Sequence, residues 1–194
     1  MFIILEGLDN AGKTTAAEII SEHFRNKGMS VYVSKELTTN VGIIIKELNR
    51  RGKLSSITKT FLFAADRQIR LEEFVKDSEN YDIIIMDRYI YSAMSYRVAE
   101  GTDLNWVKVV NDNVKKSDLA YYIDISPEES INRNSKKKFN IKYSLEYLEK
   151  VRYLYKELVR RKELILIDGM RSIEDVTTDI IKSIEEKGAF LYVE

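Results

Sequence analysis

Residues 7–14 have the types and spacing needed for phosphate chemistry. They read Gly7-Leu8-Asp9-Asn10-Ala11-Gly12-Lys13-Thr14 and match the phosphate-binding pattern G-x-x-x-x-G-K-[ST] at every position. Gly7 and Gly12 let the backbone curl until successive N–H groups point inward, and the helix that follows adds the positive end of its dipole. The sequence therefore predicts an anion-binding loop.

The side chains of this loop indicate which anion it binds. Lys13 is expected to reach the terminal phosphates of a nucleoside triphosphate, and the Thr14 hydroxyl to ligate a magnesium ion (Mg2+) that bridges them. The predicted ATP-binding residues of the loop are Gly7, Asn10, Ala11, Gly12, Lys13, Thr14 and Thr15. A glycine-rich turn that binds nothing is disfavoured, because an apolar stretch of strand length precedes the loop and a helical pattern follows it.

Composition narrows the class of protein. A chain of 194 residues is long enough for one full core, so we expect a single domain over residues 1–194. Acidic and basic residues balance at 31 each, which predicts no nucleic acid or membrane partner. The absence of cysteine excludes disulfides and thiolate zinc sites, and His23 alone cannot form a histidine metal cluster. No apolar run has the length of a membrane span, and a cytoplasmic protein is expected.

Five short apolar stretches alternate with helical patterns along the chain. The predicted strands are residues 2–5, 31–33, 82–87, 119–125 and 164–167. The predicted helices begin at 13, 41, 56, 89, 105, 127, 143 and 173, and the fifth and seventh of them cover residues 105–116 and 143–162. This alternation predicts an α/β domain of three layers with a five-stranded parallel sheet.

Polar residues that follow the strands are the next candidates, because ligands of such sheets bind outside the carboxyl ends of the strands. Asp87 ends a strand whose residues are apolar throughout and is a candidate magnesium carboxylate. Arg88 follows it and suits a phosphoryl group, which it can clamp through two hydrogen bonds. Lys35 and Glu36 follow strand 31–33, although a glutamate at this position could equally be an ordinary surface residue.

Two further patterns each have a functional and a structural interpretation. Phe63 and Arg67 lie four residues apart, so they could stack on a flat base and bond its edge; spacing alone favours a core phenylalanine beside a solvated Asp66–Arg70 pair. The densest cationic stretch, Arg133 to Lys138, predicts a phosphate-covering lid at about 133–142 or a solvated loop. Arg133 is the leading candidate for the closing cation.

A phosphate-binding loop does not by itself choose among kinases, ATPases and GTPase switches. The base-reading string Asn-Lys-x-Asp of guanine-specific switches is missing, since the nearest match, Asn26-Lys27-Gly28-Met29, lacks the aspartate. Small-molecule phosphotransfer is therefore favoured.

Several motifs in a fixed order make the chain resemble the thymidylate kinases. They are Gly7 to Thr15, Lys35-Glu36, Leu62-Phe63-Ala64-Ala65-Asp66-Arg67, Asp87-Arg88-Tyr89 with Ser92 and Tyr96, and Asp118-Leu119 through Pro127-Glu128 to Arg133. The resemblance implies a nucleoside monophosphate kinase fold, a homodimer, and magnesium-dependent transfer of the γ-phosphate of ATP to dTMP for dTTP synthesis. It also implies that Phe63 stacks on thymine, Arg67 bonds its edge, Arg88 holds the acceptor phosphate, Asp9 lies near the 3′-hydroxyl and Tyr96 crowds the 2′ position.

The chain departs from the resembled family at three places. Glu36 is followed by Leu37 where the family usually has proline, Arg97 stands where glutamine often follows the tyrosine, and Asn10 is neutral where some members have arginine. Lys35, Glu36 and Arg97 join the expected substrate-binding set. Two alternatives stay open: a deoxynucleoside kinase with Glu36 as the base, and a nucleotide-binding regulatory module without catalysis.

Overall fold

The centre of the molecule is a five-stranded sheet in the order β2-β3-β1-β4-β5, and every neighbouring pair is parallel. The strands of this computed structural model are β1 (Phe2–Glu6), β2 (Val31–Lys35), β3 (Ile83–Asp87), β4 (Leu119–Asp124) and β5 (Ile165–Asp168). The structure describes residues 1–52, 54–77, 80–135 and 143–189. All five predicted strands are present, and the predicted fold class is confirmed.

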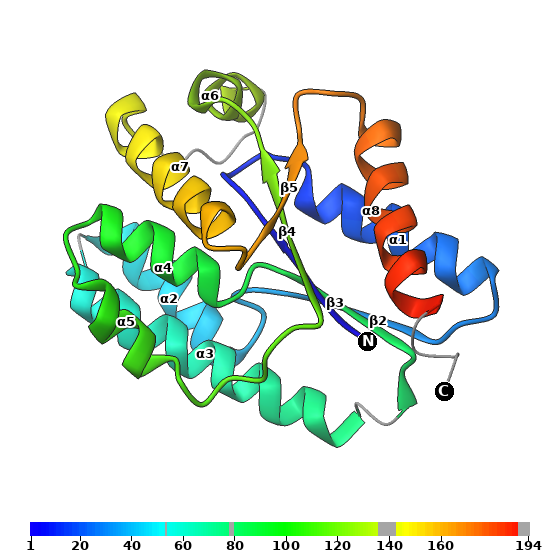
Figure 1. Cartoon of the computed structure of the whole chain (residues 1–194). Helices are drawn as coiled ribbons and strands as arrows, with labels where there is room; N and C mark the ends of the chain where they lie inside the picture. Colours follow the sequence, from blue (N-terminus) through cyan, green and yellow to red (C-terminus); the bar gives the residue numbers. More distant parts are fainter. Residues whose placement is uncertain (53, 78–79, 136–142, 190–194) are drawn as a thin grey trace.

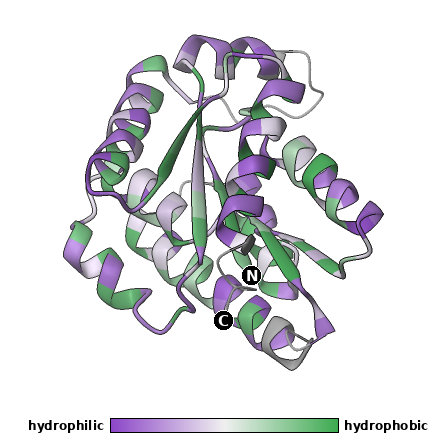
Figure 2. Cartoon of the chain, turned by 45° about the vertical axis from the view of Figure 1, so that its right-hand side comes forward, coloured by the Kyte–Doolittle hydropathy of each residue, from purple (hydrophilic) through white to green (hydrophobic). Residues whose placement is uncertain are grey.

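Helices cover both faces of the sheet (Figure 1). On one face α1 (Lys13–Asn26) packs against α8 (Ile173–Ala189). The other side carries α2 (Asn40–Arg51), α3 (Ser56–Asp77), α4 (Ile90–Ala99), α5 (Leu104–Val110) and α7 (Leu145–Arg160), while α6 (Pro127–Ser135) lies beyond the carboxyl end of β4. In Figure 2 the helices alternate between hydrophilic and hydrophobic residues, as expected when one face is buried and the other is solvated.

The sheet places the candidate residues because its strands are buried and fixed in register. Every residue of β1 and of β3 is buried, and Leu5 pairs with Asp87, which in turn pairs with Lys35 on β2. The ends of three neighbouring strands therefore bring the phosphate-binding loop, Asp87 and Lys35 to one edge, as the strand pattern predicted.

Two predicted helices differ in length from the observed ones. The helix predicted over 105–116 ends at Val110, because the Asn111 side chain donates to the Val107 carbonyl at 2.7 Å and accepts from Arg67. The helix predicted over 143–162 begins at Leu145, where the Ser144 hydroxyl caps it by accepting from Tyr147 N at 3.2 Å.

Residues 136–142 of the predicted lid, with Lys136, Lys137 and Lys138, lie outside the described residues. None of the described helices is both long and apolar enough to span a membrane.

Candidate active site

The loop between β1 and α1 has the backbone of an anion cradle. Gly7 and Gly12 have φ of 150° and 93°, and Asn10 has φ of 64° in the left-handed region that non-glycine residues rarely enter. A side chain at Gly7 would place its Cβ 2.6 Å from the Ile123 carbonyl oxygen, so only glycine fits there. Gly12 caps α1 without a side-chain hydrogen bond, so no side chain of this cap competes with an anion for the first N–H groups of the helix.

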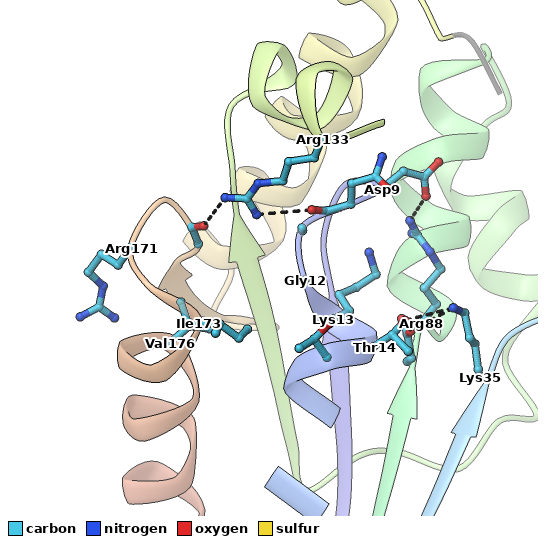
Figure 3. Close-up of a pocket in the computed structure, with 15 residues that line it drawn as sticks. Asp9, Gly12, Lys13, Thr14, Lys35, Arg88, Arg133, Arg171, Ile173 and Val176 are labelled. Atoms are coloured by element: carbon cyan, nitrogen blue, oxygen red, sulfur yellow. Dashed lines mark hydrogen bonds and ion pairs between the residues drawn. The ribbon is translucent and has the colours of Figure 1, made fainter. Parts of the chain in front are cut away.

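Lys13 is the buried cation of the loop. Its Nζ donates to the carbonyl oxygens of Gly7 at 3.1 Å and Leu8 at 2.7 Å, and the residue is 6% exposed. Burial, together with the positive charge of Arg88, lowers the pKa of Lys13 to about 8. In Figure 3 Lys13 lies between Arg133 on one side and Arg88 with Lys35 on the other.

Thr14, Asp87 and Lys35 meet at the strand ends. The Thr14 hydroxyl donates to Asp87 Oδ2 at 2.5 Å, and Lys35 Nζ donates to Thr14 Oγ1 at 3.0 Å. Asp87 Oδ1 is buried and has no hydrogen-bond partner among the described residues. An unpartnered carboxylate oxygen beside a hydroxyl fits a hard divalent cation such as magnesium. Within the described part of the chain, no group of three or more histidine, cysteine or acidic side chains is arranged to hold a metal.

Arg88 connects the loop to α4. Its guanidinium forms an ion pair with Asp9, donates from Nη1 to Ser92 Oγ at 2.9 Å and lies 5.1 Å from the centre of the Tyr96 ring. The backbone of Arg88 has φ of 74°, a strained conformation for a residue with a side chain. These contacts hold the planar guanidinium of Arg88 in one orientation between the phosphate-binding loop and α4.

Two cavities meet at these residues. The first, here called the P-loop cavity, measures about 640 Å³ and is lined by Asp9, Asn10, Ala11, Gly12, Lys13, Thr14, Thr15, Lys35, Asp87, Arg88, Arg133, Gly169, Arg171, Ile173 and Val176. The second, here called the Phe63 cavity, measures about 480 Å³; its lining includes Lys35, Glu36, Leu37, Phe63, Arg88, Tyr96, Arg97 and Tyr143. Asp9, Lys35 and Arg88 line both cavities, so two ligands could bring their charged ends together there.

Gly7 and Arg67 are the two predicted site residues that line neither cavity. Arg67 is 1% exposed and donates to Glu36 Oε1 at 2.9 Å and to Asn111 Oδ1 at 2.5 Å, so it fixes Glu36. Instead, the Arg97 guanidinium lies 5.5 Å from the centre of the Phe63 ring. The expectation of a solvated Asp66–Arg70 pair is wrong, since both residues are buried.

Arg133 lies at the other side of the P-loop cavity. Its Nε donates to Glu129 Oε1 at 2.6 Å, while Nη1 and Nη2 each lie 3.4 Å from a backbone carbonyl oxygen, of Asn10 and of Gly169. Figure 3 shows both of these carbonyl contacts. The side chain therefore bridges the phosphate-binding loop and the end of β5 while remaining 32% exposed.

Sequence reasoning missed two parts of the site. Gly169, Arg171, Ile173 and Val176 line the far end of the P-loop cavity, and the Asp168-Gly169 step that ends a strand at the sheet's carboxyl edge was a usable signal. Glu6 was missed as well, although it ends an apolar strand directly before the loop. It is fully buried behind Arg88 and accepts hydrogen bonds from α4 and α7.

Comparison with known proteins gives consistent matches. The family model for thymidylate kinase matches residues 5–180. A probable thymidylate kinase of Thermococcus kodakarensis is 36% identical, and the match covers 95% of this chain and 97% of that protein. The thymidylate kinase of Caldanaerobacter subterraneus subsp. tengcongensis is also 36% identical, with 97% of each chain covered. A probable thymidylate kinase of Sulfurisphaera tokodaii is 34% identical over 94% of this chain and 95% of that protein.

Proposed function

Because the chain belongs to the thymidylate kinase family and is an ATP-dependent kinase that converts dTMP to dTDP, we propose that the P-loop cavity binds ATP and the Phe63 cavity binds dTMP. The observation that carries this assignment is the sharing of Asp9, Lys35 and Arg88 by the two cavities. Phosphoryl transfer requires the γ-phosphate and the acceptor phosphate to lie in line and close together. Ligands that fill both cavities would meet at these three residues.

On the ATP side, Lys13 binds the terminal phosphates and the far end of the cavity holds the nucleoside, near Ile173 and Val176. Thr14 and Asp87 would hold Mg2+, in keeping with the unpartnered Asp87 oxygen. The ion, when bound, neutralises charge on the β- and γ-phosphates. Lys35 donates to Thr14 in this structure and has to yield that position when a cation occupies it.

On the dTMP side, Phe63 stacks on the base and Arg88 holds the phosphate, with Asp9 near the 3′-hydroxyl and Tyr96 at the 2′ position. Support for these roles comes from the Phe63 cavity, which all four side chains line. The resemblance gives the bond to the base edge to Arg67, which adjoins the Phe63 cavity through its hydrogen bond to Glu36; Arg97, whose guanidinium lies 5.5 Å from the centre of the Phe63 ring, is a second candidate for this bond. Lys35 and Glu36 complete the acceptor side of the site.

The residues of the site can drive transfer without a general base. An oxygen of the ionised dTMP phosphate attacks the γ-phosphorus, the bond to the β,γ-bridging oxygen breaks, and its electron pair leaves with ADP. Lys13, Arg88 and Arg133 supply positive charge along this path. A deoxynucleoside kinase would need Glu36 to take a proton from a 5′-hydroxyl, yet Glu36 Oε1 already accepts from Arg67 at 2.9 Å.

We further propose that Arg133 delivers a cation to ATP, since it lines the P-loop cavity. We also propose that the chain forms a homodimer in the cytoplasm. Apolar side chains exposed on α2, α3 and α5 support the dimer. They are Ile43 (60% exposed), Ile44 (54%), Ile57 (48%), Phe61 (55%) and Val109 (73%). Light scattering on the purified chain tests this point, and a monomeric mass at micromolar concentration contradicts it.

An acceptor panel tests the function. Purified protein with ATP and Mg2+ is incubated with dTMP, dUMP, thymidine or a ribonucleoside monophosphate, and the products are separated. We expect dTDP as the main product. Faster phosphorylation of thymidine than of dTMP would identify a deoxynucleoside kinase, and ATP binding without any product would identify a regulatory module.

A further inference from the structure

Glu6 is a fully buried carboxylate with four hydrogen-bond donors. Its Oε1 accepts from Tyr89 N at 2.8 Å and Ser92 N at 3.1 Å, and its Oε2 accepts from Ser92 Oγ at 2.6 Å and Tyr155 OH at 2.8 Å. Burial raises the pKa of Glu6, and the positive charge of Arg88 and these hydrogen bonds oppose that rise. Every group around the side chain donates to it, which is the surrounding that an ionised carboxylate requires.

Two of these bonds fix the backbone that directly follows Arg88. Tyr89 is the N-cap of α4, and its own side chain makes no capping hydrogen bond. Glu6 takes over that task from another element, since it accepts the N–H groups of Tyr89 and of Ser92 in the first turn. The preceding Arg88 N–H donates to the Leu5 carbonyl at 3.0 Å. The strained turn with φ of 74° at Arg88 is therefore held from both sides by the end of β1.

A third bond reaches the guanidinium itself. Ser92 Oγ accepts from Arg88 Nη1 at 2.9 Å and donates to Glu6 Oε2 at 2.6 Å. The carboxylate thus determines the direction of the Ser92 hydroxyl, and the hydroxyl presents its lone pairs to Arg88. Glu6 is the residue directly before the phosphate-binding loop, so the end of β1 positions both the loop and Arg88.

We propose that Glu6 is a positioning residue for phosphoryl transfer, which holds the strained Arg88 turn and aims the Arg88 guanidinium at the acceptor phosphate through Ser92. The inference rests on the proposed role of Arg88. The alternative is that Glu6 only caps α4 and stabilises the fold, in which case its loss lowers stability without a selective effect on dTMP kinetics.

Glu6→Gln tests the inference, because the amide keeps the shape of the side chain but removes its charge and places N–H donors where Ser92 and Tyr155 donate. Displacement of a positioned group by about 1 Å can lower the rate by about a hundredfold. We expect kcat/KM for dTMP to fall between about tenfold and a hundredfold, while KM for ATP changes by less than about twofold. The matched control is Tyr121→Phe, which removes a partly buried hydrogen bond to Ser183 on α8. The control is expected to lower the melting temperature without this kinetic split.

A double-mutant cycle that combines Glu6→Gln with Arg88→Ala separates the proposed role of Glu6 from the proposed role of Arg88. If Glu6 acts through Arg88, adding Glu6→Gln to Arg88→Ala lowers kcat/KM for dTMP by less than about twofold further. Additive losses, or equal effects on ATP and dTMP, overturn the role of Glu6 and leave Arg88 intact. An Arg88→Ala enzyme with unchanged dTMP kinetics overturns the role of Arg88 itself, and the inference with it. If Glu6→Gln does not fold, Ser92→Ala replaces it in the same cycle, with the same criteria.

Discussion

ATP affinity is expected to fall as the pH is raised from 7 to 9, because the free enzyme loses the positive charge of Lys13 over that range. Burial, with Arg88 nearby, lowers the pKa of Lys13 to about 8. The phosphates of ATP favour the ammonium form, so the bound complex keeps the proton. Binding of ATP to an enzyme with neutral Lys13 must therefore take up a proton from solution.

The size of the effect follows from a single titration. With a pKa of about 8, the charged fraction of Lys13 is about 0.9 at pH 7, 0.5 at pH 8 and 0.1 at pH 9. The apparent Kd for ATP rises by the inverse of that fraction, about twofold by pH 8 and about tenfold by pH 9, which is about 1.4 kcal/mol. Proton uptake is then about 0.5 per ATP at pH 8 and about 0.9 at pH 9.

The stability of the fold should rise with pH over part of this range, whereas ATP affinity falls. The pKa of Lys13 lies below its usual value of 10.5, so between about pH 8 and 10.5 the unfolded chain binds more protons than the folded one. In that window the contribution of Lys13 to the free energy of unfolding rises with pH, by about 3 kcal/mol in all. As the pH rises through this window, ATP therefore binds less tightly while buried Lys13 destabilises the fold less.

Titration calorimetry at fixed free Mg2+ measures both affinity and proton uptake when it is repeated in buffers of different ionisation enthalpy. Lys13→Met is the matched control, because it keeps an unbranched side chain without an ionisable group. Its ATP affinity should be weaker but constant between pH 7 and 9. A wild-type affinity that changes by less than about twofold over this range, or a Lys13→Met variant with the same pH dependence, contradicts the reasoning.

Three substitutions test the other assigned roles. Phe63→Ala should raise KM for dTMP with little change in kcat, since stacking stabilises ground and transition states alike; an effect confined to ATP contradicts the assignment of the cavities. Tyr96→Ala should relax discrimination against a ribonucleotide acceptor, which the ratio of kcat/KM for dTMP and rTMP measures; an unchanged ratio places the 2′ exclusion elsewhere. Arg133→Ala should lower kcat at saturating ATP and dTMP by at least about tenfold, about 1.4 kcal/mol, and Glu129→Gln, which removes the negative charge that pairs with Arg133 but keeps the arginine, by much less. A smaller loss in Arg133→Ala would mean that another residue supplies the closing charge.

The parts of the site that sequence could predict are those set by short-range patterns. A few consecutive residues are enough to recognise the glycines of the loop, the apolar run that ends at Asp87 and the strand that ends at Lys35. Parallel pairing then brings the ends of these strands together.

The burial of charged residues depends on contacts that are distant in the sequence. Arg67 is buried because Glu36 and Asn111 accept its hydrogen bonds, and Asn111 is 44 positions away.

Glu6 illustrates the same limit within the site. Its partners Ser92 and Tyr155 lie 86 and 149 positions further along the chain. A glutamate at the end of an apolar strand looks like an exposed strand terminus until those donors are known, because a carboxylate is buried only where hydrogen bonds and charge offset its desolvation. Local pattern thus predicts where the chain reaches the site, and tertiary contacts decide which charged groups face a ligand.

The ion pairs made by the cations of the site bear on how the site receives phosphate. Lys35 lies 3.8 Å from Asp87 Oδ2, Arg88 is paired with Asp9, and Arg133 with Glu129. Carboxylates therefore hold these three cations beside the two cavities, and an incoming phosphate replaces a carboxylate as the partner of Arg88 or Arg133 with little movement of the cation. Lys13 differs, because its Nζ donates to two backbone carbonyl oxygens and its charge is opposed by burial. Phosphate binding should therefore restore the proton of Lys13, and for this reason the pH dependence of ATP affinity reports on this side chain.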